Sequence, residues 1–412
     1  MDIHLLTYAS GLHHPDAVRR AHEPMLAELE THFNVHLTDY RQIDRLRPDD
    51  FYLLFLATGG VENLVVHQFE RLSPPVFLLA DGAQNSLAAA LETATWLRNQ
   101  GIKCEILHGQ PSELSHRIRQ LHLEFQAQRA LSNTRIGVIG APSSWLVASG
   151  VDYLLAKRRW GVEYVDIPLE RVMSCYEQIT DAQAADQAAQ MCQQALACRE
   201  PSTEDMLKAV RLYRAIRQVA LDERLDALTL SCFKLIEPTG TTGCLALSLL
   251  NNEGIIAGCE GDLQSIFTML AVKALTGKSS FMANPSVIHP STREITFAHC
   301  TIGTAQTEKF ILRNHFESGT GVGIQGIVPL GNVTILKCGG ECLDEYYVSG
   351  GQLVENSNEL NLCRTQLRVR LDTTTHYFLK NPLGNHHIVV QGEHESLFEE
   401  FFDTNGCRRV VV

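Results

Sequence analysis

The chain places carboxylate and imidazole side chains at the ends of several short apolar segments, where they could converge on one divalent metal ion. Glu260 and Asp262 follow one apolar run, and His299 ends a later one. Near the C-terminus, the pair His386-His387 begins another apolar run. Oxygen and imidazole ligands together suit Mn²⁺ or another borderline cation.

Each of these residues also has a purely structural interpretation. An acidic residue between a strand and a helix often caps the helix, so Glu260 and Asp262 could serve that role alone. His299 could be an interior histidine with its hydrogen bonds satisfied. On an alternating strand, His386 and His387 point to opposite faces, so at most one of them can easily reach a shared site. Their joint occurrence favours a metal site, but spacing alone does not establish one.

Further polar residues could contact a substrate. Lys234 ends an apolar strand and could bind a substrate oxygen or act as an acid or base, although an exposed lysine is the ordinary outcome. Ser144 and Trp145 follow another strand, where a hydroxyl group and an indole would suit a sugar; a strand-to-helix turn with a serine cap is the alternative. Glu317 and Arg364 could line a cleft or form a salt-bridged surface.

Length and composition indicate a soluble globular protein of two or three domains. The chain has 412 residues, of which 45% are hydrophobic and 20% charged. A net charge of −12 argues against a nucleic-acid-binding surface, which needs clustered lysine and arginine. We therefore expect no membrane-spanning helix and no signal peptide. The 12 cysteines form no CxxC pair, so we expect reduced, buried thiols in the cytoplasm.

The order of apolar runs predicts an α/β fold with two parallel-sheet α/β domains followed by a β-rich C-terminal domain. Strands alternate with helices in the first third, and the pattern restarts with a strand at Arg135. From Arg293 onward, alternating segments rich in threonine, valine and glycine indicate antiparallel strands. We expect domains at residues 1–130, at 131–290 with the Glu260 site, and at 291–412.

These segments resemble those of the L-fucose isomerase and L-arabinose isomerase superfamily of metal-dependent aldose–ketose isomerases. Four segments of this chain look like the metal-site segments of arabinose isomerases: Glu260-Gly-Asp262, Ser280-Phe-Met, Ala298-His299 and Asn385-His386-His387. Two turns of this chain look like turns of smaller fucose-isomerase-like proteins: Thr58-Gly-Gly-Val-Glu62 and Ser144-Trp145. The resemblance covers about residues 227–299 and the C-terminal strand firmly, and the rest faintly.

The resemblance implies two α/β domains, a β-rich C-terminal domain, and active sites between domains and often between subunits of a trimer or hexamer. It also implies a metal, usually Mn²⁺, held by two carboxylates and a histidine. By position, Glu260 would be the first carboxylate, His299 an additional histidine, and His386 or His387 the closing ligand.

This sequence departs from the family at the position of the second carboxylate ligand. The arabinose-type alignment places Ala283 there, and the fucose-type spacing places Asn284 there, 24 residues after Glu260. An amide oxygen can coordinate a hard cation, but it adds no charge and cannot act as a base. Asp262, Glu237 or Glu317 could supply the missing carboxylate.

We therefore expect a cytoplasmic, homo-oligomeric isomerase that interconverts an aldose and a ketose through a metal-bound enediolate. The metal, most simply Mn²⁺, would act as a Lewis acid. Glu260 with Asp262 or Lys234 would move the proton between adjacent carbons.

Four residues would hold the hydroxyl groups of a small sugar substrate: Ser144, Trp145, Glu317 and Arg364. Two alternatives stay open. The first is a non-catalytic sugar-binding or regulatory homologue, which Asn284 motivates. The second is a lyase or epimerase that uses the same enediolate chemistry, because fold analogy does not fix function.

Overall fold

A computed structural model describes residues 1–411 of the chain. The chain divides into two compact units, residues 1–129 and residues 130–412, which are described separately. The division into three domains at residues 130 and 290 stays a prediction. Among the described residues, every helix is too short or too polar to cross a membrane, and the cytoplasmic location also stays a prediction.

The first unit is built on a five-stranded parallel sheet in the order β2-β1-β3-β4-β5. Its strands are β1 (Asp2–Tyr8), β2 (Asn34–Asp39), β3 (Tyr52–Leu56), β4 (Val76–Leu79) and β5 (Cys104–Leu107). Its helices are α1 (Pro15–Ala21), α2 (Glu23–His32), α3 (Glu62–His67), α4 (Ser86–Asn99) and α5 (Pro111–Ser132), the last of which runs into the second unit. Two short 3₁₀ turns are η1 (Tyr40–Arg45) and η2 (Phe69–Arg71).

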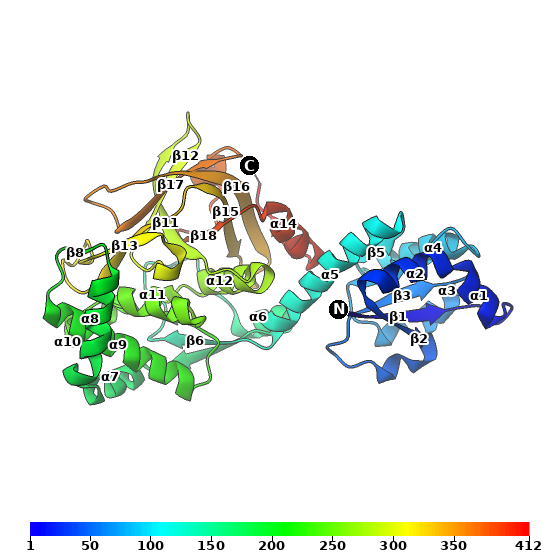
Figure 1. Ribbon diagram of the computed structural model, residues 1–412, viewed down its shortest axis with the longest axis horizontal. Helices are drawn as coiled ribbons and strands as arrows, with labels where there is room; N and C mark the ends of the chain where they lie inside the picture. The colour runs from blue at the N-terminus through cyan, green and yellow to red at the C-terminus, as the bar shows by residue number, and fades with distance from the viewer. Residues whose placement is uncertain (412) are drawn as a thin grey trace. The chain divides into compact units, whose positions relative to one another are not determined.

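Helices cover both faces of this sheet (Figure 1). One apolar cluster includes Leu26 of α2 and Ile118 of α5, and the other includes Val65 of α3 and Leu97 of α4. A parallel sheet with both faces covered needs strands that are apolar throughout, as β3 is.

The second unit begins with a four-stranded parallel sheet in the order β10-β9-β6-β7. The strands are β6 (Arg135–Ile139), β7 (Glu163–Ile167), β9 (Ala227–Leu230) and β10 (Ile256–Cys259). The helices are α6 (Tyr153–Trp160), α7 (Leu169–Gln178), α8 (Asp181–Gln194), α9 (Thr203–Asp222), α10 (Ile236–Thr239), α11 (Cys244–Glu253) and α12 (Leu263–Thr276), with a 3₁₀ turn η3 (Cys232–Leu235). Nearly every side chain of α12 is buried, because it packs between this sheet and the β-rich part.

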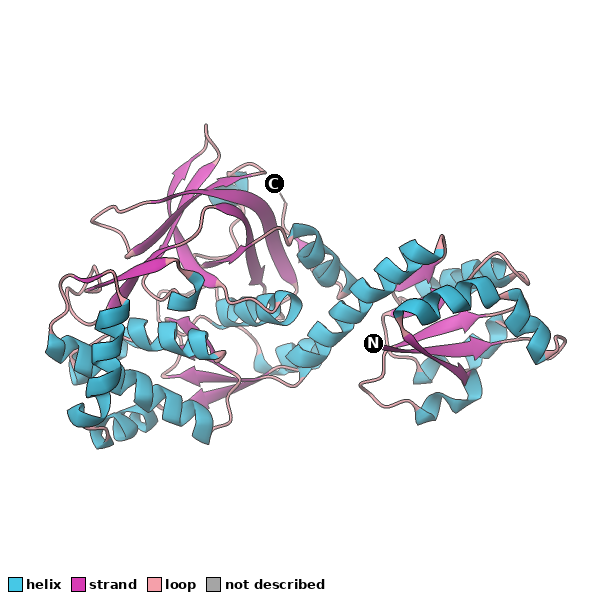
Figure 2. Ribbon diagram, viewed as in Figure 1, coloured by secondary structure: helices cyan, strands magenta, loops and turns pink. Residues whose placement is uncertain are grey.

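The rest of the second unit is β-rich (Figure 2). A seven-stranded sheet contains β11 (Phe281–His289), β12 (Glu294–His299), β15 (Gly331–Gly339), β16 (Glu345–Asn356), β17 (Thr365–Leu371), β18 (His387–Gln391) and β19 (Arg408–Arg409). Pairing of β15 with both β16 and β18 closes six of these strands into a barrel. A separate small sheet joins β8 (Ala197–Cys198), β13 (Lys309–Arg313) and β14 (Gly323–Ile327). The remaining elements are η4 (Thr304–Gln306), α13 (His376–Lys380) and α14 (Glu395–Thr404). The predicted fold class is confirmed.

Strand register in the barrel brings the predicted histidines together. Strand β11 lies between β12 and β18, with Asn284 opposite Ala298 and Ala283 opposite His387. The end of β12, at His299, and the beginning of β18 therefore meet at the same level of β11. Residues about 90 positions apart in sequence become neighbours through this pairing.

Candidate metal centre

Glu260 lies in a tight turn between β10 and α12. Its φ is +62° and that of Gly261 is +73°, and its carbonyl oxygen accepts a hydrogen bond from the Ser143 N–H at 2.9 Å. A Cβ on Gly261 would lie 2.5 Å from the Cα of Pro142, so the close approach of the two turns requires glycine. The left-handed conformation costs Glu260 about 1–2 kcal/mol. Such strain is concentrated at functional sites.

The Glu260 carboxylate is held as an anion. The Trp145 indole N–H donates to Oε2 at 2.6 Å, and His386 Nε2 lies 3.6 Å from Oε1. Burial would raise the pKa of Glu260, but the nearby His386 ring, the charge of His299 and the Trp145 hydrogen bond together lower it to about 2. Glu260 is therefore better suited to bind a cation than to take up a proton near neutral pH.

His386 is oriented from behind by Asp262. Asp262 caps α12 by accepting the Ser265 N–H at 2.7 Å, and its Oδ2 lies 2.9 Å from His386 Nδ1. Burial would raise the pKa of Asp262, but Lys337 Nζ, 3.8 Å away, and His386 lower it well below its ordinary value. When Nδ1–H donates to this carboxylate, Nε2 is left with a free lone pair, which is the usual arrangement of a metal-binding histidine.

His299 completes the group from the end of β12. Its Nδ1 lies 3.0 Å from the Thr301 hydroxyl oxygen, and its ring centroid is 5.5 Å from that of His386. Burial, followed by the charge of His386, lowers the pKa of His299 to about 4. The imidazole is therefore neutral at physiological pH, as a metal ligand must be.

These three residues fit a divalent metal ion. One ligand atom from each of Glu260, His299 and His386 lies within 4.8 Å of the other two. His386 Nε2 is buried without a hydrogen-bond partner, a condition that costs free energy unless another group occupies the position. One carboxylate and two imidazoles suit Mn²⁺, Fe²⁺, Co²⁺ or Zn²⁺.

A cavity of about 160 Å³ opens beside this group. Glu260, His299 and Asn284 line it, together with Glu317 and His315. The described carboxylates in its wall are therefore Glu260 and Glu317. A small polar ligand placed in the cavity would be next to these candidate metal ligands.

His387 faces away from the candidate metal centre, as the alternation of a strand requires. Its Nε2 lies 3.0 Å from the Tyr377 hydroxyl group and its Nδ1 lies 3.1 Å from the Asn385 carbonyl oxygen. Burial lowers the pKa of His387 to about 3. Of the two adjacent histidines, His386 is the one whose ring reaches Glu260.

Asn284 lies on β11 in the cavity wall. Its Oδ1 accepts a hydrogen bond from Asn385 Nδ2 at 3.2 Å. A carbonyl oxygen has two lone pairs, so this bond leaves one for another donor or a cation. Its role as a ligand stays a prediction.

The other predicted residues are spread around the site. Trp145 contacts Glu260 directly, whereas Ser144 beside it is exposed. Lys234 is exposed, and its Nζ donates to the Gly140 carbonyl at 3.0 Å. Arg364 Nε donates to the Asn314 carbonyl at 2.7 Å. Substrate contacts by Ser144 and Arg364, and an acid or base role for Lys234, stay predictions.

Sequence reasoning missed the buried Lys337. It is fully buried, donates to the Ser265 hydroxyl oxygen at 3.1 Å and lies 3.8 Å from Asp262 Oδ2. Burial lowers the pKa of Lys337, and Asp262 opposes this effect. The sequence pattern could have predicted its burial, because Lys337 lies on the same strand face as the apolar, buried residues Val333 and Ile335.

Comparisons with known proteins point to sugar isomerases. No protein-family model matches the chain. A sulfoquinovose isomerase of Clostridium sp. (strain MSTE9) is 26% identical over 265 residues, which are 60% of this chain and 58% of that protein. A sulfoquinovose isomerase of Alkalicoccus urumqiensis is 22% identical over 224 residues, or 53% of this chain and 50% of that protein.

A third relative, the sulfoquinovose isomerase of Priestia aryabhattai, is 24% identical over 226 residues, or 53% of this chain and 50% of that protein. The chain thus spans about half the length of the curated relatives it matches. The resemblance to sugar isomerases that the motifs indicated is confirmed by these similarities.

Proposed function

We propose that the protein is a metal-dependent aldose–ketose isomerase that acts on a small sugar or sugar derivative. The observation that carries the proposal is the convergence of Glu260, His299 and His386, with His386 Nε2 buried and unpartnered, beside a cavity. The similarity to sulfoquinovose isomerases supports the reaction class. It makes sulfoquinovose the first substrate to test.

Glu260, His299 and His386 would hold the metal, with Mn²⁺ as the leading candidate. A divalent ion there would supply a Lewis acid that stabilises negative charge developing on the substrate's carbonyl oxygen. Asp262 keeps the His386 ring oriented, and Lys337 balances the Asp262 charge in the buried interior.

Proton transfer between adjacent substrate carbons needs a base in the cavity wall. With a pKa of about 2, Glu260 is a weak base. Asp262 is fully buried behind His386. Glu317 lines the cavity and is exposed. We therefore assign the proton-transferring role to Glu317, and anion and metal binding to Glu260.

The two carboxylates can be separated experimentally. Glu260→Gln should lose the bound metal and activity together. Glu317→Gln should keep the metal, lose activity and stop deuterium uptake from D₂O at the carbon adjacent to the carbonyl. Glu308→Gln, which changes an exposed carboxylate just before β13, is the matched control and should leave metal content and turnover unchanged.

Activity of the natural protein and of these variants would be measured on sulfoquinovose and a panel of aldoses, with Mn²⁺ added. Full activity of Glu260→Gln, or purified protein that binds no divalent metal, would refute the isomerase assignment. Stabilisation by a sugar without conversion would instead support the non-catalytic homologue. A product other than the ketose would indicate a lyase or epimerase.

A homo-oligomer is the second part of the proposal. Trp145 is 52% exposed although it contacts Glu260, and Val147 and Leu154, which follow it in the sequence, are 90% and 72% exposed. Exposed apolar side chains close to a site favour a covering subunit. Light scattering should give a trimer or hexamer for the natural chain and smaller species for a Val147→Asp, Leu154→Asp double variant.

A further inference from the structure

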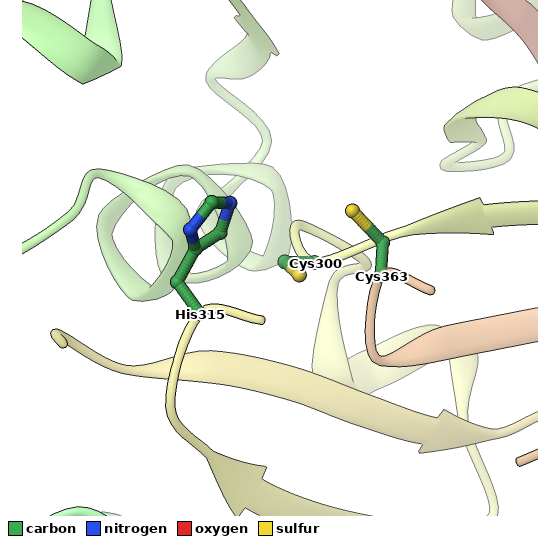
Figure 3. Close-up of side chains that lie close together, drawn as sticks. All are labelled: Cys300, His315 and Cys363. Carbon is green, nitrogen blue, oxygen red and sulfur yellow. The ribbon is translucent and has the colours of Figure 1, made fainter. Parts of the chain in front are cut away.

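A second group of metal-binding side chains lines the same cavity. Cys300 follows β12, His315 follows β13, and Cys363 precedes β17. One ligand atom from each of these three residues lies within 4.8 Å of the other two. Figure 3 shows the thiols and the imidazole gathered from three separate segments of the chain. The Glu260, His299 and His386 centre uses none of them.

From this arrangement we propose that Cys300, His315 and Cys363 form a separate site for a thiophilic divalent cation, with Zn²⁺ as the natural occupant. Two thiolates and one imidazole are soft and borderline donors, which Zn²⁺ prefers and Mn²⁺ does not. Zinc–sulfur bonds of about 2.3 Å and zinc–nitrogen bonds of about 2.0 Å place tetrahedral ligands roughly 3.5–3.8 Å apart. The donors need to move inward only slightly.

Backbone and side-chain contacts already hold the thiol ligands in position. The Arg364 N–H donates to Cys300 Sγ at 3.4 Å, a contact that favours the thiolate. The Arg364 guanidinium group donates to the Asn314 carbonyl at 2.7 Å, which ties the Cys363 segment to the His315 segment. Because these contacts already hold the ligands in place, binding a cation requires little further ordering of the ligand side chains.

The imidazole is oriented in the same way. His315 Nδ1 lies 3.2 Å from the Ser318 hydroxyl oxygen. The Ser318 backbone N–H also donates to Nδ1 at 3.4 Å, so Ser318 holds the ring through both its hydroxyl and its backbone groups. Phe233 packs edge-on against the ring, with centroids 5.6 Å apart. His315 is 6% exposed, so its orientation is fixed by these contacts.

The charge balance is favourable. Binding of Zn²⁺ releases one proton from each of the Cys300 and Cys363 thiols, and the resulting two thiolates and neutral imidazole give an uncharged complex. A neutral complex is less costly to bury than an isolated cation. Cys363 is half-buried beside the cavity, so an ion can reach the site from there. The bound ion would fix three loops that form the cavity wall.

Cobalt is the probe that separates the two sites. Co²⁺ bound to thiolates gives an ultraviolet charge-transfer band, whereas Co²⁺ bound to carboxylate and imidazole does not. We expect the natural protein, stripped and reloaded with Co²⁺, to show this band. Cys363→Ser should abolish it together with one bound ion per chain. Cys232→Ser, at a thiol lining the same cavity outside the group, is the matched control and should retain it.

A variant of the other centre tests independence. Glu260→Gln should keep the thiolate band even if it loses its own metal and all activity, so failure of this inference and failure of the isomerase proposal are distinguishable. Absence of the band in the natural protein, or an unchanged band in Cys363→Ser, would overturn the inference.

A measurement on the natural chain covers the case in which Cys363→Ser does not fold. Alkylation of the folded protein, read by mass spectrometry, should label Cys363 in the metal-free state. Added Zn²⁺ should protect it, while labelling of the exposed Cys198 continues. Equal labelling of Cys363 with and without Zn²⁺ would also overturn the inference.

Discussion

Asp262 Oδ2 lies 2.9 Å from His386 Nδ1, and this contact turns the opposite ring nitrogen of His386 toward Glu260. The same carboxylate caps α12 and faces the buried ammonium group of Lys337. One side chain therefore links helix formation, the charge balance of the core and the orientation of a candidate metal ligand.

Replacing Asp262 should separate these three roles. Asp262→Asn can still cap α12, but it should weaken metal binding about 10- to 100-fold because His386 loses its anionic partner. It should also destabilise the fold by about 3 kcal/mol, since Lys337 is left buried without its counter-charge. A double variant, Asp262→Asn with Lys337→Met, should recover most of the stability and none of the metal affinity. Calorimetric titration and urea unfolding measure the two effects.

The metal-free protein should lose stability as pH rises through the titration of His386. Burial would lower the pKa of His386, but the Asp262 hydrogen bond and the negative charges of Asp262 and Glu260 raise it from 6.5 to about 8. A raised pKa stabilises the fold fully below about pH 6.5, and this contribution disappears as pH rises through about 8. We expect a loss of about 2 kcal/mol across that window. His299, with its lowered pKa, costs stability only below about pH 6.5, so it does not oppose the slope.

Urea unfolding of chelator-treated protein across this pH window measures the slope, and His386→Gln should remove it. An identical slope in the variant would assign the effect to another group. Metal binding should show the opposite trend, because the metal displaces a proton from His386. The apparent affinity should rise toward pH 8 and then level off.

The turn that carries Glu260 should not tolerate a side chain at Gly261. Gly261→Ala combines a left-handed backbone with contact against Pro142, so we expect a loss of about 2–4 kcal/mol and a large drop in metal affinity. Gly277→Ala is the matched control, because its φ of +68° is similar but the space around it is open. That variant should lose only about 1 kcal/mol and bind metal normally. Equal losses in the two variants would show that backbone strain alone matters.

Trp145 should tune the Glu260 carboxylate through its indole N–H. Trp145→Phe removes the 2.6 Å hydrogen bond but can keep the edge-on packing against Phe233. We expect the pKa of Glu260 in the metal-free protein to rise from about 2 toward its ordinary 4.5. Carbon-13 NMR of labelled glutamate in natural and variant protein measures this shift. An unchanged pKa would mean that His386 and His299 alone hold the anion.

The sequence determined the order of elements and the chemistry available to the site. Apolar runs alternating with helical patterns require a parallel sheet with covered faces. Strand alternation also required that His386 and His387 face opposite ways. Glu260, His299 and His386 were candidates from their positions at segment ends.

The tertiary structure decided which of these residues meet. Strand alternation predicts that His386 and His387 point to opposite faces. The barrel closure and the register of β11 determine which of these two faces lies against Glu260. The packing of α12 against β15 places Lys337 behind Asp262. Cys300, His315 and Cys363 come together because three strand ends converge there. Such long-range pairing depends on the whole sheet, so no local pattern in the sequence could specify it.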